Sequence, residues 1–207
     1  MDRAYVDRAR HLLDGVTDRR VILGITGAPA AGKTTFATEL VAALAADGVS
    51  VAYVPMDGFH LAAAELARLG RSDRKGAPDT FDPGGYRVLL HRIRHEPVDV
   101  WAPAFDRTLE EPVAGSIPVA AQCELVITEG NYLLHDADGW AGVRAELEEL
   151  WFCRVVDDVR LQRLIARRIE FGQDRVAAET WAHGSDQRNA DLVAASMSRA
   201  DLIVDVG

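Results

Sequence analysis

The stretch Gly27-Ala-Pro-Ala-Ala-Gly32-Lys33-Thr34 decides the fold of this chain. It fits G-x-x-x-x-G-K-[ST], the pattern of a loop whose backbone N–H groups surround the phosphates of a nucleotide. The apolar run 21–26 before the loop predicts a buried strand, and residues 34–46 after it predict a helix. A strand, a loop and a helix in this order direct a helix N-terminus at the phosphates. We therefore expect the chain to bind ATP or GTP.

The side chains of this loop have separate expected tasks. The residues expected to hold the nucleotide are Gly27, Ala28, Ala30, Ala31, Gly32, Lys33, Thr34 and Thr35. In this pattern the lysine reaches the β- and γ-phosphates, and the hydroxyl of Thr34 binds Mg²⁺. Only two of the 23 basic residues, Lys33 and Lys75, are lysines. A lysine in the loop agrees with a phosphate site, because a compact ammonium fits between two phosphates where a planar guanidinium does not.

The composition favours one cytoplasmic α/β domain spanning 1–207, because 48% apolar residues in 207 supply a core for a domain of that size. No apolar run approaches the roughly 18 residues of a membrane span, and the charged segment 1–18 lacks a signal-peptide pattern. Cys123 and Cys153 lie in apolar surroundings and form no metal-binding pattern, so we expect reduced, buried thiols. The net charge of −9 argues against nucleic-acid binding, which needs a basic face.

Strands alternate with helices along the chain, which predicts a mostly parallel, doubly wound sheet. The expected strands are 21–26, 49–54, 98–102, 124–130, 150–156 and 200–206. The expected helices are 5–13, 34–46, 61–69, 82–95, 140–150, 157–171 and 187–195, with polar breaks at 70–80 and 172–184. Residues 2–14 form a lead-in helix, 58–119 an insertion with a small hairpin in 105–119, and 160–186 a lid. In such sheets, ligands bind at the carboxyl ends of the strands.

Two carboxylates follow predicted strands and are candidates for chemistry. Glu129 ends a strand that should neighbour strand 21–26, so it would face the metal or its waters; the alternative is a surface acid or a loop cap. Asp57 lies just beyond strand 49–54, where it could hydrogen-bond a substrate hydroxyl and take its proton. The alternative for Asp57 is a turn before Gly58.

A group of arginines is spaced for one helix face. Arg160, Arg163 and Arg167 are three and four residues apart, so we expect them to lie together and to close as a lid over ATP. Their guanidinium groups would then stabilise the charge on the transferring phosphoryl group. The alternative is a solvated face paired with Asp157, Asp158 and Glu170.

Six segments together resemble a known superfamily. They are GAPAAGKTT, VPMDGFH, KGAPDTFDPGGY, APAFDR, VITEGNYLL and RLQRLIARR, in family order over about residues 20–206. The chain is similar to P-loop kinases of the uridine kinase, phosphoribulokinase and bacterial pantothenate kinase superfamily, and most to short bacterial members labelled as fructose-transport-associated or nucleoside/nucleotide kinases. The resemblance implies a three-layer α/β/α P-loop fold with a hairpin and a helical lid. It also implies a Mg²⁺- and ATP-dependent phosphotransferase whose acceptor is a hydroxyl of a sugar, a nucleoside, pantothenate or a related acid.

The resemblance also assigns roles to residues of this chain. It implies that Asp57 is the base, that Glu129 is the acidic residue at the strand end, and that Arg163 and Arg167 are lid arginines. It implies an acceptor pocket containing His60, Asp79, Tyr86, Phe105 and Arg107. The stretch Phe105-Asp106-Arg107 lacks the histidine with which uridine kinases grip the base, which disfavours a nucleoside. Arg107 and His60 suit a polar or anionic acceptor instead. The expected partner is this small-molecule acceptor, and a second copy of the chain in a homodimer is left open.

Two other functions are weighed. One is an ATP-dependent regulatory switch without a small-molecule acceptor. A GTPase switch is disfavoured because the sequence lacks the N-K-x-D segment that reads guanine. The other is a kinase of a different P-loop branch, such as a gluconate or adenylylsulfate kinase, in which the pocket between Asp57 and Arg107 is arranged differently.

Overall fold

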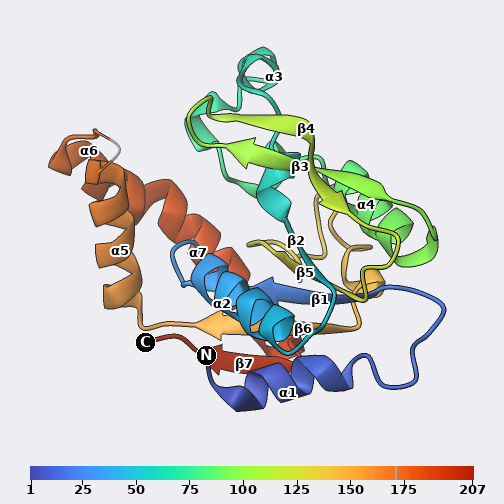
Figure 1. Ribbon diagram of the computed structural model, residues 1–207. Helices are drawn as coiled ribbons and strands as arrows, with labels where there is room; N and C mark the ends of the chain where they lie inside the picture. Colours follow the sequence, from blue (N-terminus) through green and yellow to red (C-terminus); the bar gives the residue numbers. More distant parts are fainter. Residues whose placement is uncertain (171) are drawn as a thin grey trace.

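The computed structural model describes residues 1–170 and 172–207 (Figure 1). Its main sheet has five strands in the order β2-β5-β1-β6-β7. They are β1 (Val21–Thr26), β2 (Val51–Pro55), β5 (Leu125–Glu129), β6 (Glu149–Arg154) and β7 (Leu202–Asp205). Every neighbouring pair is parallel, so the α/β class and the doubly wound sheet are confirmed.

The register of three strands brings their carboxyl ends to the same edge of the sheet. Ile25 of β1 and Pro55 of β2 both lie opposite Glu129 of β5. The P-loop follows β1 and Asp57 follows β2, so both start from this edge. The prediction that the strand ending at Glu129 neighbours strand 21–26 is confirmed.

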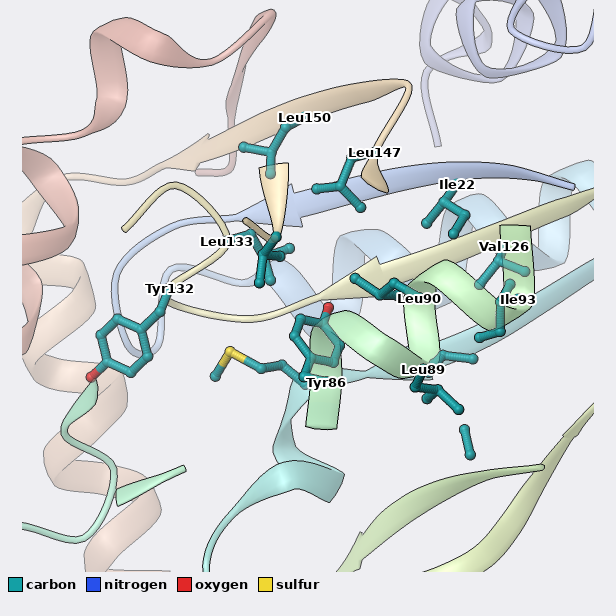
Figure 2. Packing of buried hydrophobic residues seen from close by; sticks show 14 of the residues in the cluster. Ile22, Tyr86, Leu89, Leu90, Ile93, Val126, Tyr132, Leu133, Leu147 and Leu150 are labelled. Carbon is teal, nitrogen blue, oxygen red and sulfur yellow. The ribbon is translucent and has the colours of Figure 1, made fainter. Parts of the chain in front are cut away.

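Helices cover both faces of the sheet. On one face, α1 (Arg3–His11) and α2 (Lys33–Ala46) pack through residues such as Val6, Phe36 and Leu40. On the other face lie α4 (Pro83–His95) and residues 132–147. Figure 2 shows α4 directing Tyr86, Leu90 and Ile93 toward the apolar side chains of the sheet. The three layers expected from the sequence are therefore present.

The start of α4 follows the sequence prediction. Asp82 is the N-cap, and its carboxylate accepts a 2.8 Å hydrogen bond from the backbone N–H of Gly85. Pro83 occupies the first turn, where a missing N–H costs nothing.

A separate antiparallel hairpin, β3 (Val100–Asp106) and β4 (Glu111–Val119), stands beside the end of β2. Between β2 and the hairpin come the short helix η1 (Met56–Phe59), α3 (Ala63–Arg68), η2 (Ser72–Arg74) and η3 (Pro78–Thr80). The hairpin approaches η1 so closely that a Cβ on Gly58 would lie 2.3 Å from the carbonyl oxygen of Pro103. Glycine at this position thus lets the hairpin pack beside Asp57.

Residues 157–170 and 175–194 form a helical unit at one end of the sheet (Figure 1). It consists of α5 (Asp157–Glu170), α6 (Arg175–Trp181), a π-helical segment (Ala182–Asp186) and α7 (Gln187–Ala194). The short helix η6 (Met197–Arg199) leads into β7. The predicted helix end at residue 171 lies outside the described residues.

Two predicted segments were wrong. Residues 140–150 are mostly turns with the short helix η4 (Arg144–Glu146), and β6 begins at Glu149. The predicted polar break 172–184 is largely helical, because α6 and the π-helical segment occupy it.

The cysteine prediction is confirmed, since Cys123 and Cys153 are both buried and free. Among the described residues, none of the helices has the length and apolar character needed to cross a bilayer.

Candidate active site

The P-loop has a backbone that only certain residues adopt easily. Gly27, Ala30 and Gly32 all have positive φ angles, of 149°, 62° and 90°. A Cβ on Gly27 would lie 2.5 Å from the carbonyl oxygen of Cys153, so β6 leaves no room for a side chain there. Gly32 is the N-cap of α2 and has no side chain to accept from the first-turn N–H groups. These N–H groups are therefore available to an anion.

Lys33 lies at the base of this loop and is buried. Its ammonium donates to the carbonyl oxygen of Ala28 at 3.0 Å and to Oδ1 of Asn131 at 2.7 Å. Burial lowers the pKa of Lys33, while the nearby Glu129 carboxylate opposes this shift. Asn131 was missed by the sequence interpretation, although it belongs to the quoted stretch VITEGNYLL.

Glu129 faces the P-loop from the end of β5. Its Oε1 accepts hydrogen bonds from the hydroxyls of Thr34 at 3.1 Å and Tyr53 at 2.9 Å. Burial raises the pKa of the Glu129 carboxyl, and the positive charge of Lys33 opposes this shift. The carboxylate and the Thr34 hydroxyl supply the hard oxygen ligands that Mg²⁺ prefers, so these residues fit the expected metal.

A single cavity of about 1150 Å³ gathers most of the candidate residues. The predicted site residues that line it are Ala30, Gly32, Lys33, Thr34, Thr35, Asp57, His60, Phe105, Arg107, Glu129, Arg163 and Arg167. Gly27, Ala28 and Ala31 belong to the same loop but do not line the cavity. The P-loop, the end of β2, the hairpin and α5 thus meet around one space.

Asp57 and Arg107 both line this cavity and are in contact with each other. Nη2 of Arg107 lies 3.4 Å from Oδ2 of Asp57, and both side chains are partly exposed. His60 lies between the aromatic rings of Phe81 and Phe105, at centroid distances of 4.0 Å and 4.9 Å. Its Nδ1 is 2.9 Å from the carbonyl oxygen of Asp57, so that nitrogen carries the proton. Burial lowers the pKa of His60, which favours the neutral ring.

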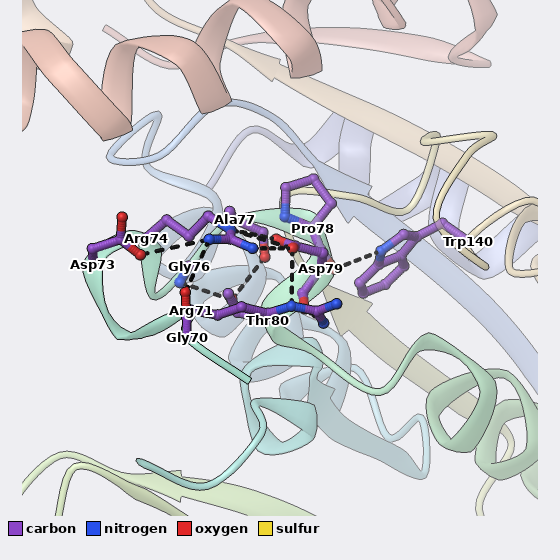
Figure 3. Close-up of polar contacts among 10 residues, drawn as sticks. All are labelled: Gly70, Arg71, Asp73, Arg74, Gly76, Ala77, Pro78, Asp79, Thr80 and Trp140. Atoms are coloured by element: carbon purple, nitrogen blue, oxygen red, sulfur yellow. Dashed lines mark hydrogen bonds and ion pairs between the residues drawn. The ribbon is translucent and has the colours of Figure 1, made fainter. Parts of the chain in front are cut away.

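Asp79 and Tyr86, both predicted for the acceptor pocket, do not line the cavity. The Tyr86 hydroxyl is buried and lies 2.6 Å from Oγ1 of Thr128. Burial raises the pKa of this hydroxyl. The Asp79 carboxylate pairs with Arg74 at 2.9 Å and with Arg71 at 3.3 Å, and these contacts hold the loop 70–80 together (Figure 3). The structure therefore places one of them in the core and the other in a loop-stabilising network.

The arginines of α5 separate into different environments. Arg163 and Arg167 line the cavity. Arg160 does not line the cavity with them, because it is buried, pairs with Asp157 at 2.9 Å and donates to Gln187. Arg168 also lines the cavity, where it lies 3.1 Å from Asp186 and 4.8 Å from the ring centroid of Trp181.

Several cavity residues were missed by the sequence interpretation. They are Ser72, Lys75, Asn131, Trp181, Asp186 and Asn189. Two of them lie in stretches that carry the family resemblance, Lys75 in KGAPDTFDPGGY and Asn131 in VITEGNYLL. Asp186 ends the π-helical segment, a type of irregularity that occurs often at functional sites.

Comparisons with known proteins find a matching family and similar chains. A sequence profile described as the "Phosphoribulokinase / Uridine kinase family" matches residues 22–207. The crystal structure of a "putative fructose transport system kinase" from Silicibacter sp. TM1040 is 37% identical, covers 97% of each chain and superposes with a TM-score of 0.91. The "ATP-dependent kinase-like protein notR'" of Aspergillus versicolor is 33% identical over 66% of this chain and 85% of its own length. The "Uncharacterized protein YggC" of Escherichia coli K12 is 31% identical over 91% of this chain and 78% of its own length.

Proposed function

This chain belongs to the phosphoribulokinase/uridine kinase family, and we propose that it transfers the γ-phosphate of ATP to a hydroxyl group of a small polar metabolite. Membership makes it a P-loop kinase of a small molecule. The observation that carries the finer proposal is the single cavity that Lys33, Asp57 and Arg167 line together. A phosphate-binding cation, a carboxylate and a lid cation around one space are the parts that phosphoryl transfer needs.

The reaction assigns one role to each of these groups. Lys33 and the P-loop N–H groups hold the β- and γ-phosphates. The acceptor hydroxyl oxygen attacks the γ-phosphorus while the bond from that phosphorus to the bridging β,γ-oxygen breaks, and ADP leaves. Asp57 accepts the hydroxyl proton as the new bond forms. Its place at the rim, just after β2, favours this role because the hairpin side of the cavity remains for the acceptor.

Thr34 and Glu129 are the residues that would hold Mg²⁺, directly or through water. When bound, the ion supplies positive charge that neutralises the phosphate oxygens. Tyr53 donates to the same Glu129 oxygen as Thr34, so it orients the carboxylate toward the P-loop. Arg163 and Arg167 of α5 add positive charge to the cavity. This charge would stabilise the negative charge that develops on the transferring phosphoryl group.

The test is a screen for acceptor-dependent ADP release with the purified chain, ATP and Mg²⁺. The panel contains uridine, cytidine, pantothenate, fructose, ribulose 5-phosphate and D-glycerate. A kinase of this type releases ADP faster when its acceptor is present and forms a phosphorylated product. ATP hydrolysis that ignores every metabolite and responds to a protein partner would instead indicate a regulatory switch.

A further inference from the structure

Both lysines of this chain line the same cavity, although they are far apart in the sequence. Lys33 belongs to the P-loop, and Lys75 reaches the cavity from the loop between η2 and η3. The Lys75 ammonium lies 5.0 Å from the ring centroid of Phe105, and the guanidinium carbon of Arg107 lies 5.9 Å from the same centroid. In a chain with a net charge of −9, two cations thus meet at one ring on the acceptor side of the site.

We propose, on the basis of the proposed kinase function, that the acceptor carries an anionic group, a carboxylate or a phosphate, which Lys75 and Arg107 bind. Because Arg107 also lies 3.4 Å from Asp57, an anion held there brings a hydroxyl of the same molecule within reach of the Asp57 carboxylate. Lys75 and Arg107 are therefore specificity-determining residues, and the anion fixes the orientation of the acceptor.

The backbone around Lys75 is held in place, which argues against a freely moving surface lysine. The carbonyl oxygen of the next residue, Gly76, accepts hydrogen bonds from the Tyr132 hydroxyl and from Nδ2 of Asn189. The contacts of Arg71 and Arg74 with Asp79, shown in Figure 3, further stabilise the same loop. The position of Lys75 is thus fixed by contacts to the segment after β5, to α7 and within its own loop rather than by its ligand.

The present partners of the two cations can be exchanged for a ligand. Lys75 donates to the carbonyl oxygen of Glu110 at 2.8 Å and lies 3.5 Å from the Glu110 carboxylate. An ammonium has three donors, so at least one remains for an anion. The Glu110 and Arg107 side chains are 62% and 56% exposed, and ion pairs with such exposure are weak. A bidentate contact from Arg107 to a carboxylate or phosphate is stronger.

The same geometry disfavours a neutral nucleobase. The Phe105 ring would be the natural surface for stacking, but a base there would share the ring with two cations. An anion is attracted by both cations instead. Neutral His60, packed against Phe105, retains an unprotonated Nε2 that can accept a hydrogen bond from an acceptor hydroxyl.

The test compares matched acceptors that differ in the anionic group. The pairs are D-glycerate and glycerol, ribulose 5-phosphate and ribulose, and pantothenate and pantothenol, which separate carboxylate from phosphate recognition. We expect kcat/KM from ADP release to be at least about tenfold higher for the anionic member of the accepted pair. Equal use of both members would overturn the inference and leave the kinase function standing.

Variants of the two cations test the residues themselves. Lys75→Gln and Arg107→Gln should each raise the KM of the accepted anion by about tenfold or more, while the KM of ATP stays within about twofold. Lys75→Arg keeps the charge and should restore most of the affinity. Arg92→Gln removes an exposed cation of α4 that pairs only with Glu96 among the described residues, so it is the matched control.

Direct binding separates this inference from the proposed function. Calorimetry with D-glycerate and ribulose 5-phosphate is done on the chain saturated with Mg²⁺ and a non-hydrolysable ATP analogue. If an anion binds to the wild type and not to the Lys75→Gln/Arg107→Gln double variant, the anion site is supported. This holds even if no compound stimulates ADP release. The absence of stimulated ADP release would contradict the proposed kinase function alone. If neither anion binds, or if the double variant binds them as the wild type does, the inference is wrong.

Discussion

The ammonium of Lys33 donates a 2.7 Å hydrogen bond to Oδ1 of Asn131, and this contact joins the P-loop to the segment that follows β5. Lys33 is buried, so its charge depends on the few groups that surround it. Those groups are the Ala28 carbonyl oxygen, the Asn131 amide oxygen and the nearby Glu129 carboxylate. Asn131, which lies outside the P-loop motif, thus helps to hold the Lys33 ammonium in position at the phosphate-binding loop.

Asn131→Ala should destabilise the chain by about 1–3 kcal/mol, because a buried ammonium loses a hydrogen-bond partner. Urea unfolding measures this free energy. Gln122→Ala removes an exposed amide far from the P-loop and should change stability by less than about 0.5 kcal/mol. Equal stability of Asn131→Ala and the wild type would mean that Lys33 does not need this partner.

Asp57→Asn should lower kcat by roughly 10²–10⁴ with the best acceptor, because the amide cannot take the hydroxyl proton. ATP binding, measured by calorimetry, should be retained in this variant, since Asp57 is not a phosphate ligand. Lys33→Ala is the contrasting variant and should abolish turnover through loss of phosphate binding. Full activity of Asp57→Asn would remove the carboxylate from the mechanism.

Gly58→Ala should lower stability by about 1–3 kcal/mol or more, because its Cβ would lie 2.3 Å from the Pro103 carbonyl oxygen and force the hairpin away. The same displacement moves Phe105 relative to Asp57, so the KM of the acceptor should rise. Thermal unfolding and acceptor titration measure the two effects. Gly184→Ala is the matched control, since a Cβ there meets nothing within 4 Å.

Acid should destabilise the chain partly through His60. Burial lowers the pKa of His60 in the folded chain below its usual 6.5, so below about pH 6.5 the unfolded chain binds a proton that the folded chain does not. Unfolding therefore becomes easier as the pH falls from about 6.5 toward the depressed folded pKa, at up to about 1.4 kcal/mol per pH unit.

The measurement compares unfolding free energies of the wild type and His60→Gln between about pH 5 and pH 7. His60→Gln should show a shallower fall, whereas His11→Gln, at a side chain that is 77% exposed, should follow the wild type. Parallel curves for the wild type and His60→Gln would show that His60 does not contribute to the acid sensitivity.

The features predicted correctly from the sequence depend on residues that are close along the chain. The strand, loop and helix around Lys33, and the N-cap at Asp82, are local patterns of this kind. Segment 140–150, wrongly predicted as a helix, has apolar residues at helical spacing. Contacts with residues that are distant in the sequence determine its actual conformation. The indole of Trp140 donates to the Pro78 carbonyl oxygen, and Leu147 packs where a Cβ on Gly24 would lie 2.6 Å away. Such contacts leave no periodic signal.

The same limit applies to the site. Asp57, Glu129 and Lys33 could be placed at one edge of the sheet from the sequence because each follows, ends or starts a regular element there. Lys75 could not, since the loop that carries it is positioned by Tyr132 and Asn189, which are distant in sequence. Arg160 was grouped with its neighbours because spacing shows only that residues share a helix, not which neighbouring helix covers them.

Arg160 and Arg167 should therefore respond oppositely to truncation. Arg160→Ala removes a buried guanidinium that bonds Asp157 and Gln187, so it should cost about 1–3 kcal/mol of stability while the kcat of the surviving folded enzyme stays close to wild type. Arg167→Ala removes a cation that lines the cavity, so it should lower kcat by about tenfold or more with little change in stability. Urea unfolding and acceptor-saturated ADP release on both variants make the comparison. A loss of kcat in Arg160→Ala as large as that in Arg167→Ala would mean that the whole helix face acts on the phosphate, because a residue packed against α7 can reach the γ-phosphate only if α5 rotates during turnover.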